Sequence, residues 1–155
     1  MFRAGLGLLV AGAFCLAAVA QDCAPDRVTV QGNRGEAMFR IEIADDPQER
    51  ARGLMHVARM PMMEGMLFLY DQPQAVSFWM RNTLIPLDML FVGPDGVILR
   101  IHENAEPMND TPIPGGEGVL AVLEINGGMS ARLGLEPGDA LRHPAFGPDA
   151  ALPCN

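Results

Sequence analysis

The 155-residue chain has no lysine and few of the residues that usually carry catalysis, with two serines, three histidines and three cysteines. Neither Ser77 nor Ser130 lies in the G-x-S-x-G pattern that presents a nucleophilic serine in many hydrolases. The histidines are not paired at H-x-H or H-x-x-x-H spacing, which argues against a zinc site. No C-x-x-C redox motif is present. The sequence thus lacks the most easily recognised catalytic motifs, and we predict no cofactor.

Positive charge is also scarce, and all of it is arginine. The chain has eleven arginines and nineteen Asp and Glu residues, which gives a formal net charge of −8 at pH 7. Nucleic acids and anionic membranes attract basic surfaces, so this balance argues against either as a partner. The short acidic glycine-rich run at 115–118 is equally unsuited to cradling a phosphate. Arginine suits two-pronged pairing with carboxylates, and we expect the few cations to be used in this way.

The first twenty residues have the organisation of a secretory signal peptide. Arg3 gives a positive start, residues 6–19 are mainly apolar, and the A-V-A run at 18–20 supplies small residues for cleavage before Gln21. The apolar run is shorter than the ~20 residues that a membrane-spanning helix prefers. We therefore expect an exported protein, periplasmic or secreted, with no stable membrane span after cleavage.

Signal cleavage would leave two cysteines, Cys23 near the new N-terminus and Cys154 next to the C-terminus. An even number of cysteines in an oxidising compartment favours a disulfide. The ends of compact domains often lie close together. We therefore predict a Cys23–Cys154 bridge, with two free thiols as the alternative.

The rest of the chain alternates short apolar runs with turn residues, which is typical of a β-rich domain. Asp46 and Pro47 predict a short helix over 47–55, and Gly134 ends a second helical turn at 127–134. The turn at 93–96 predicts a hairpin, and the strands should follow one another as an antiparallel meander. The expected strands are 28–30, 39–43, 66–70, 77–80, 87–92, 97–102, 119–125 and 140–142.

These elements indicate a mainly β fold, α+β by strict count. The economical architecture is a compact antiparallel sandwich or distorted barrel with one or two short helices. Residues 103–118 are rich in proline and glycine and have no apolar period. Long segments of this kind are often functional, so we expect a flap or rim near Trp79 and Asn82, with a plain connector as the alternative.

The most informative segment is 77–91, which sets Trp79, Arg81, Asn82, Thr83 and Asp88 among apolar, strand-like residues. A buried polar group must find a partner or a ligand. Two strand-like runs flank the turn residues of this segment, so Arg81 and Asp88 could meet across a hairpin. Either they form a structural ion pair beside a core tryptophan, or the segment is the floor of a small binding cleft.

Four blocks in order and spacing resemble the domain of unknown function 192 family of prokaryotic proteins. They are GLM at 53–55, GMLF at 65–68, FWMRNT at 78–83 with PLD at 86–88, and VLEINGG at 122–128. The resemblance covers roughly 37–142, between a signal at 1–20 with an N-terminal extension at 21–36 and a C-terminal tail at 143–155. It implies a compact, mainly β domain, often behind a signal or anchor. It implies no established activity, catalytic residue or cofactor.

A methionine-rich stretch is a second chemical signal. Met60, Met62 and Met63 lie close to His56, and thioethers with an imidazole are soft ligands suited to Cu(I). Methionine is also a common gap filler in apolar cores. Copper binding is therefore the less favoured of these two interpretations.

We predict a binding module for an unknown small ligand or a periplasmic protein. The candidate ligand-binding residues are Trp79, Arg81, Asn82, Thr83, Asp88 and Glu124. The alternative is an enzyme of a hydrolase type, with Asp88 or Glu124 as general base and Arg81 and Asn82 orienting a polar substrate. The sequence leaves open whether the protein is an enzyme.

Overall fold

The computed structural model describes residues 23–154, so the expected signal peptide lies outside the described residues. This part of the chain forms seven strands and two short α-helices, which confirms the predicted mainly β fold. The strands are β1 (Arg27–Gly32), β2 (Gly35–Ala44), β3 (Glu64–Phe78), β4 (Leu87–Val92), β5 (Ile98–Ala105), β6 (Ile113–Asn126) and β7 (Ala140–Arg142). The helices are α1 (Pro47–Arg52) and α2 (Met129–Leu133), followed near the C-terminus by a 3-10 turn, Pro144–Phe146.

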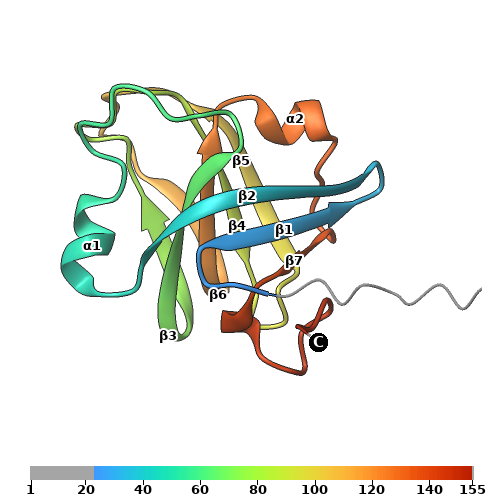
Figure 1. Ribbon diagram of the computed structural model, residues 1–155. Helices are drawn as coiled ribbons and strands as arrows, with labels where there is room; N and C mark the ends of the chain where they lie inside the picture. Colours follow the sequence, from blue (N-terminus) through green and yellow to red (C-terminus); the bar gives the residue numbers. More distant parts are fainter. Residues whose placement is uncertain (1–22, 155) are drawn as a thin grey trace, which may run out of the picture.

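The seven strands form one curled sheet in the order β5-β4-β6-β3-β2-β1-β7 (Figure 1). The predicted meander is wrong at two points. First, β6 lies between β3 and β4, so these consecutive strands are not neighbours. Second, β2 and β3 run parallel, and α1 lies in the crossover that joins them. At one corner the sheet almost closes, because Val97, the residue before β5, forms an isolated bridge to Ala140 of β7.

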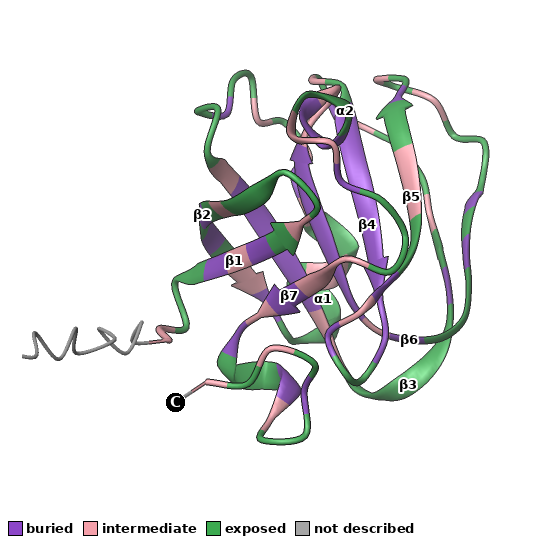
Figure 2. Cartoon of the chain, turned by 90° about the vertical axis from the view of Figure 1, so that its right-hand side faces the viewer, coloured by how far each residue is buried: buried purple, intermediate pink, exposed green. Residues whose placement is uncertain are grey.

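Alternating side chains give the sheet two apolar faces. One core gathers Phe39, Leu67, Leu90 and Leu123, and the other gathers Phe68, Met80, Met89, Phe91 and Val122. Every residue of β4 is buried, because the strand lies deep in the sheet with side chains in both cores (Figure 2). Strand β6 therefore points Leu123 to the first core and its neighbours Val122 and Glu124 to the second.

Helix α1 starts as the sequence predicts and ends earlier. The Asp46 side chain accepts hydrogen bonds from the backbone N–H groups of Gln48 and Glu49 at 2.7 and 2.8 Å, a regular N-terminal cap. The helix stops at Arg52 because Gly53 adopts φ 48°, which an L-residue rarely tolerates. The predicted last turn to Met55 is instead a non-helical turn, and it faces the second core through Leu54.

The predicted long loop at 103–118 is wrong over much of its length. Strand β5 continues to Ala105, only 106–112 form a loop, and β6 begins at Ile113. A Cβ at Gly115 would lie 2.4 Å from Cδ1 of Phe91, so glycine allows the strand to pack closely there. Gly116 has φ 90°, close to where the β3–β6 register shifts. The glycines therefore mark an irregular strand rather than a loop.

Cys23 and Cys154 are joined by a disulfide with a Cα–Cα distance of 5.6 Å, which confirms the predicted bridge. Beside it, Nε2 of His143 lies 3.2 Å from the carbonyl oxygen of Pro25. Burial lowers the pKa of His143, so the ring is neutral at pH 7. Both ends of the described chain are thus fixed to the same side of the sheet. In the described part of the chain, no helix has the length and apolar character needed to span a membrane.

Candidate functional site

A cleft of about 400 Å³ opens between α1 with its following turn and strands β3 and β6. Its walls are largely aromatic, and its polar groups come from four separate segments of the chain. The lining residues that the argument uses are Arg50, Arg52, Leu54, Phe68, Tyr70, Phe78, Trp79, Thr83 and Glu124. Concave sites with apolar walls and a few convergent polar groups are typical places for small ligands.

Glu124 is the most unusual residue of the cleft. It lies on β6 between its cross-strand neighbours Met66 and Met89, and only 4% of its surface is exposed. Among residues 23–154 its carboxyl group has neither a hydrogen-bond partner nor an ion-pair partner. Burial without compensation raises the pKa of Glu124 to about 8. The group is therefore mostly protonated and neutral at pH 7.

Tyr70 and Arg50 form the wall beside Glu124. The guanidinium of Arg50 lies over the Tyr70 ring, 5.2 Å from its centre. Its Nη1 donates to the carbonyl oxygens of Leu69 and Asp45, at 2.7 and 2.5 Å. Burial raises the pKa of the Tyr70 hydroxyl, while Arg50 acts in the opposite direction and Glu124 reinforces the rise. Arg50 is thus held in place by an aromatic ring and two backbone groups.

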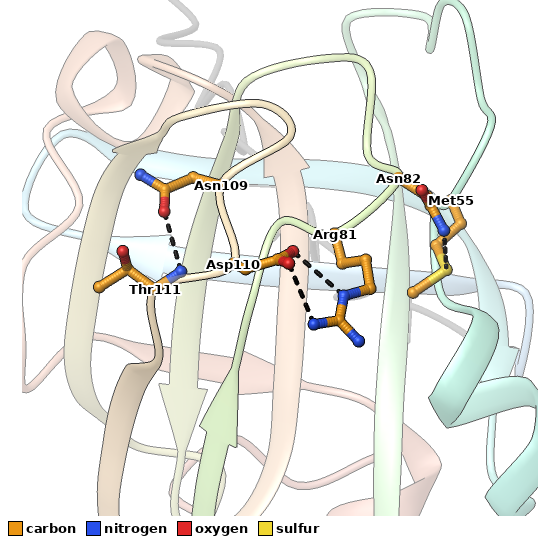
Figure 3. A network of polar contacts seen from close by, with 6 residues as sticks. All are labelled: Met55, Arg81, Asn82, Asn109, Asp110 and Thr111. Carbon is orange, nitrogen blue, oxygen red and sulfur yellow. Dashed lines mark hydrogen bonds and ion pairs between the residues drawn. The ribbon is translucent and has the colours of Figure 1, made fainter.

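Arg81 does not meet Asp88, so the predicted hairpin contact is wrong. The guanidinium of Arg81 instead donates to both oxygens of Asp110, at 3.1 and 3.0 Å (Figure 3). This hydrogen bonding lowers the pKa of Asp110 and raises that of Arg81. Arg81 also stacks on the Trp79 ring at 3.9 Å from its centre. The pair lies on the surface and presents Trp79 at the rim of the cleft.

Asp88 has a structural position on the other side of the sheet. Its two carboxylate oxygens accept four hydrogen bonds, from the backbone N–H groups of Asn104, Gly128 and Ser130 and from the Ser130 hydroxyl. Side chains alternate along a strand, so Asp88 points away from Met89, whose side chain joins the core that Glu124 faces. The structure therefore does not bring the two candidate carboxylates together.

Thr83 lines the cleft near the loop 106–112, and Asn82 lies next to it in the chain. The backbone of Asn82 adopts φ 54°, and its backbone carbonyl accepts a hydrogen bond from the N–H of His56 at 2.8 Å. The side-chain amide of Asn82 donates to Sδ of Met55 at 3.9 Å. Thr83 is buried and lines the cleft. The loop lies beside this segment, as expected, because Met108 donates to the Thr83 carbonyl at 3.0 Å. Backbone hydrogen bonds thus hold the loop against the site.

The methionine-rich stretch is divided between interior and surface. Met60 is buried in the second core, whereas Met62 and Met63 have exposed fractions of 54% and 37%. His56 is exposed on the turn after α1. Over the described residues, the His, Cys, Asp and Glu side chains form no group of three that could hold a metal ion.

Of the candidate residues predicted from the sequence, Trp79, Thr83 and Glu124 line the cleft. The sequence analysis did not include Arg50, Arg52 and Tyr70, which line it too. Two signals were available. Tyr70 is the only tyrosine and ends the apolar run of β3, where a polar tip at the edge of a core is common. The arginines of α1 fall on the crossover between parallel strands, a connection that the predicted meander did not contain.

Glu124 should make stability depend on pH in an unusual direction. In the unfolded chain the group ionises near its ordinary pKa of 4.5, and in the folded chain near 8. Its contribution is fully present below pH 4.5 and decreases as the pH rises to 8, by at most about 1.4 kcal/mol per unit. Glu124→Gln removes this dependence. We therefore expect chemical denaturation to show that the free energy of unfolding of the variant, relative to that of the wild type, rises steadily from pH 5 to pH 8. A difference in free energy that does not change with pH would contradict the assignment.

The comparisons with known proteins point to one family. The family model DUF192, described as "Uncharacterized ACR", matches residues 28–143. This match includes β1, which lies within the expected N-terminal extension. The search of curated proteins found no match.

Two solved structures are similar in both sequence and fold. A protein of unknown function from Novosphingobium aromaticivorans is 50% identical, with a TM-score of 0.73 over 74% of this chain and 82% of that one. A protein from Sinorhizobium meliloti, provisionally described as a transcription regulator, is 43% identical, with a TM-score of 0.74 over 77% of this chain and 94% of that one.

Proposed function

The chain belongs to the uncharacterised domain of unknown function 192 family, and we propose that it is an exported protein whose cleft binds a small ligand through Glu124. The observation that carries this proposal is the Glu124 carboxyl group, which lines the cleft and has no partner among the described protein groups. Its oxygens are accessible from the cleft, since no fully buried side-chain N or O atom of the described residues lacks a hydrogen-bond partner. A carboxyl group that the protein leaves unpaired is available to a ligand that enters the cleft. A residue of this kind at the base of an open cleft is best explained by a ligand that supplies the missing hydrogen bond or charge.

The aromatic walls suit the apolar part of such a ligand. Phe68 and Phe78 meet edge to face with ring centres 5.1 Å apart, and Trp79 stands at the rim with 44% of its surface exposed. Arg81, Asn82 and Asp88 would act indirectly. Arg81 stacks on Trp79, Asn82 holds Met55, and Asp88 supports the opposite face of the sheet. Ligand contact is thus assigned to Trp79, Thr83 and Glu124.

A catalytic role for Glu124 is the second candidate, favoured by its raised pKa in a cleft. At pH 7 a carboxyl with a pKa of about 8 donates a proton rather than accepting one. The general-base role would therefore require a pH above 8 or a cationic ligand. The lining residues contain no histidine and no second carboxylate that could complete an acid–base pair.

Export is supported by the disulfide between Cys23 and Cys154, because such bonds persist in oxidising compartments. The apolar segment before Gln21 supports the same localisation. The description of the Sinorhizobium meliloti relative raises a regulatory role. For this chain a net charge of −8 disfavours direct contact with nucleic acid.

A thermal-shift screen of the mature protein with amino acids, sugars, amines and cell-wall fragments tests the proposal. A ligand at a hundred times its Kd should stabilise the fold by about 2.7 kcal/mol. Ala51 lies at the cleft on the exposed side of α1, so Ala51→Trp should fill the opening without disturbing the core. Ala58→Trp places the same side chain on the surface outside this cleft and serves as the control.

We expect any specific ligand to stabilise the wild type and the Ala58→Trp variant, and to lose its effect on the Ala51→Trp variant. Glu124→Gln should weaken binding at least tenfold. A ligand that stabilises the Ala51→Trp variant as much as the wild type would place the binding site elsewhere and refute the proposal.

A further inference from the structure

The cleft contains two groups of opposite charge type that lack partners within residues 23–154. One is the carboxyl of Glu124, and the other is the guanidinium of Arg52, an exposed side chain at the last residue of α1. Resting on the function proposed above, we propose that the ligand is a small zwitterion. Its ammonium group lies against the Glu124 carboxylate, and its carboxylate lies against the Arg52 guanidinium.

The surroundings of Glu124 favour an ammonium group over a neutral donor. Phe68, Tyr70 and Phe78 line the same cleft, and the faces of aromatic rings attract cations. Met66 and Met89, on the strands either side of Glu124, are apolar and offer no competing charge. An ammonium group would pair with Glu124 in its ionised form. The attraction between the two charges is stronger in a low-dielectric site than in water.

A simple amine would fit this cleft less well than a zwitterion. Arg50 and Arg52 both line the cleft from α1 and would repel a ligand that carries only positive charge. Arg50 is already committed to the Tyr70 ring and to two backbone carbonyls. Arg52 is therefore the guanidinium available for a carboxylate, which it can bind through two parallel hydrogen bonds.

The volume sets the class of zwitterion. About 400 Å³ is at the lower end of the range for ligand sites, enough for an amino acid or a dipeptide. Leu54, Phe68 and Phe78 supply an apolar wall for the ligand's side chain. A free amino acid and a short peptide share this chemistry and differ in the separation of their charges, so probes of both lengths belong in the test.

Isothermal titration calorimetry with L-phenylalanine and three relatives tests the proposal. L-phenylalaninamide lacks the carboxylate, N-acetyl-L-phenylalanine lacks the ammonium group, and L-phenylalanyl-L-phenylalanine separates the two charges further. We expect the amino acid or the dipeptide to bind at least tenfold more tightly than both singly charged probes. The better of the two identifies the free amino acid or the peptide as the ligand class.

Titrations at pH 7 in buffers of different ionisation enthalpy add a second readout. Glu124 must give up its proton to pair with an ammonium group, so close to one proton should be released per zwitterion that binds with its amine already protonated. The other ionisable or charged lining groups are Tyr70 of β3 and Arg50 and Arg52 of α1.

Three variants assign the two charges. Arg52→Gln should weaken zwitterion binding about tenfold and, because it removes a repelling charge, should not weaken the binding of L-phenylalaninamide. Glu124→Gln should abolish the proton release. Arg132→Gln, on α2 and outside the cleft, is the matched control and should behave as the wild type.

The experiments distinguish two outcomes: that the ligand is not a zwitterion, and that the cleft binds no ligand. If N-acetyl-L-phenylalanine or another singly charged ligand binds as tightly as the zwitterions, and Ala51→Trp still blocks it, the zwitterion assignment is wrong and the cleft proposal stands. Absence of binding by all four probes at millimolar concentration also overturns the zwitterion assignment. The thermal-shift screen described above then tests separately whether the cleft binds any ligand.

Discussion

Opening the Cys23–Cys154 disulfide should lower the free energy of unfolding by about 5 kcal/mol, on a model of loop-closure entropy. The bridge joins residues 131 positions apart, so it restricts almost the whole mature chain in the unfolded state. Urea denaturation of the mature protein with and without reductant measures the difference directly. A domain of this size has a total stability of only about 5–15 kcal/mol, so reduction should leave the fold marginal.

A double variant separates the bond from side effects of the reductant. Cys23→Ser with Cys154→Ser should reproduce the reduced wild type, and its stability should not change when reductant is added. Single alkylation of each cysteine in unreduced protein would show that the bridge is absent in solution. Equal stability of oxidised and reduced protein would show that the unfolded state is already restricted by other means.

Asp88→Ala should cost at least ~4 kcal/mol, since each buried donor left unsatisfied costs about 1–3 kcal/mol. The substitution strands the backbone N–H groups of Asn104, Gly128 and Ser130 and the Ser130 hydroxyl. These donors come from the end of β5 and from the start of α2, so the loss should loosen both at once. Chemical denaturation and hydrogen exchange at these residues measure the two effects.

Two further aspartate variants make the test specific. Asp88→Asn keeps the shape but turns an amide N–H group toward donors, so it should recover only part of the loss. Asp110→Ala removes the partner of Arg81 on the surface and should leave stability nearly unchanged, because exposed ion pairs contribute little. If Asp88→Ala is as stable as Asp110→Ala, the supporting role of Asp88 is wrong.

Local signals predicted the elements whose cause is local. Asp46 and Pro47 start α1 where the capping pattern requires it, and Gly134 ends α2 in the left-handed conformation at φ 65°. The turn at 93–96 joins β4 and β5 as expected. The disulfide was predicted from the cysteine count and the expected compartment. In each case the residues that decide the structure lie close together or are few in number.

Strand neighbours could not be predicted in the same way. Segments 77–80 and 87–92 are close in sequence, and a hairpin between them was the simplest inference. Strand β6 pairs with both β3 and β4 and so takes the place that the hairpin required. Tertiary pairing of this kind depends on strands far apart in the chain, which local periodicity does not encode.

The same limit explains which part of the site was found. Glu124 stood out as an acid within an apolar run, and Trp79 and Thr83 as unusual residues in a strand-like segment. The arginines of α1 belong to the cleft only because β2 and β3 are parallel and α1 crosses between them. Arg81 pairs with Asp110 rather than with Asp88 because the loop 106–112 lies against the segment after β3.

The central place of β6 also constrains the order in which the protein can assemble. Without β6, the ladders of the described sheet separate into a β4–β5 hairpin and a group formed by β1, β2, β3 and β7. The bridge from Val97 to Ala140 uses a residue made later still. A nascent chain that ends before Ile113 therefore has two halves with no ladder between them and its apolar faces uncovered. Folding must wait until nearly the entire chain has emerged, which is compatible with the export proposed above.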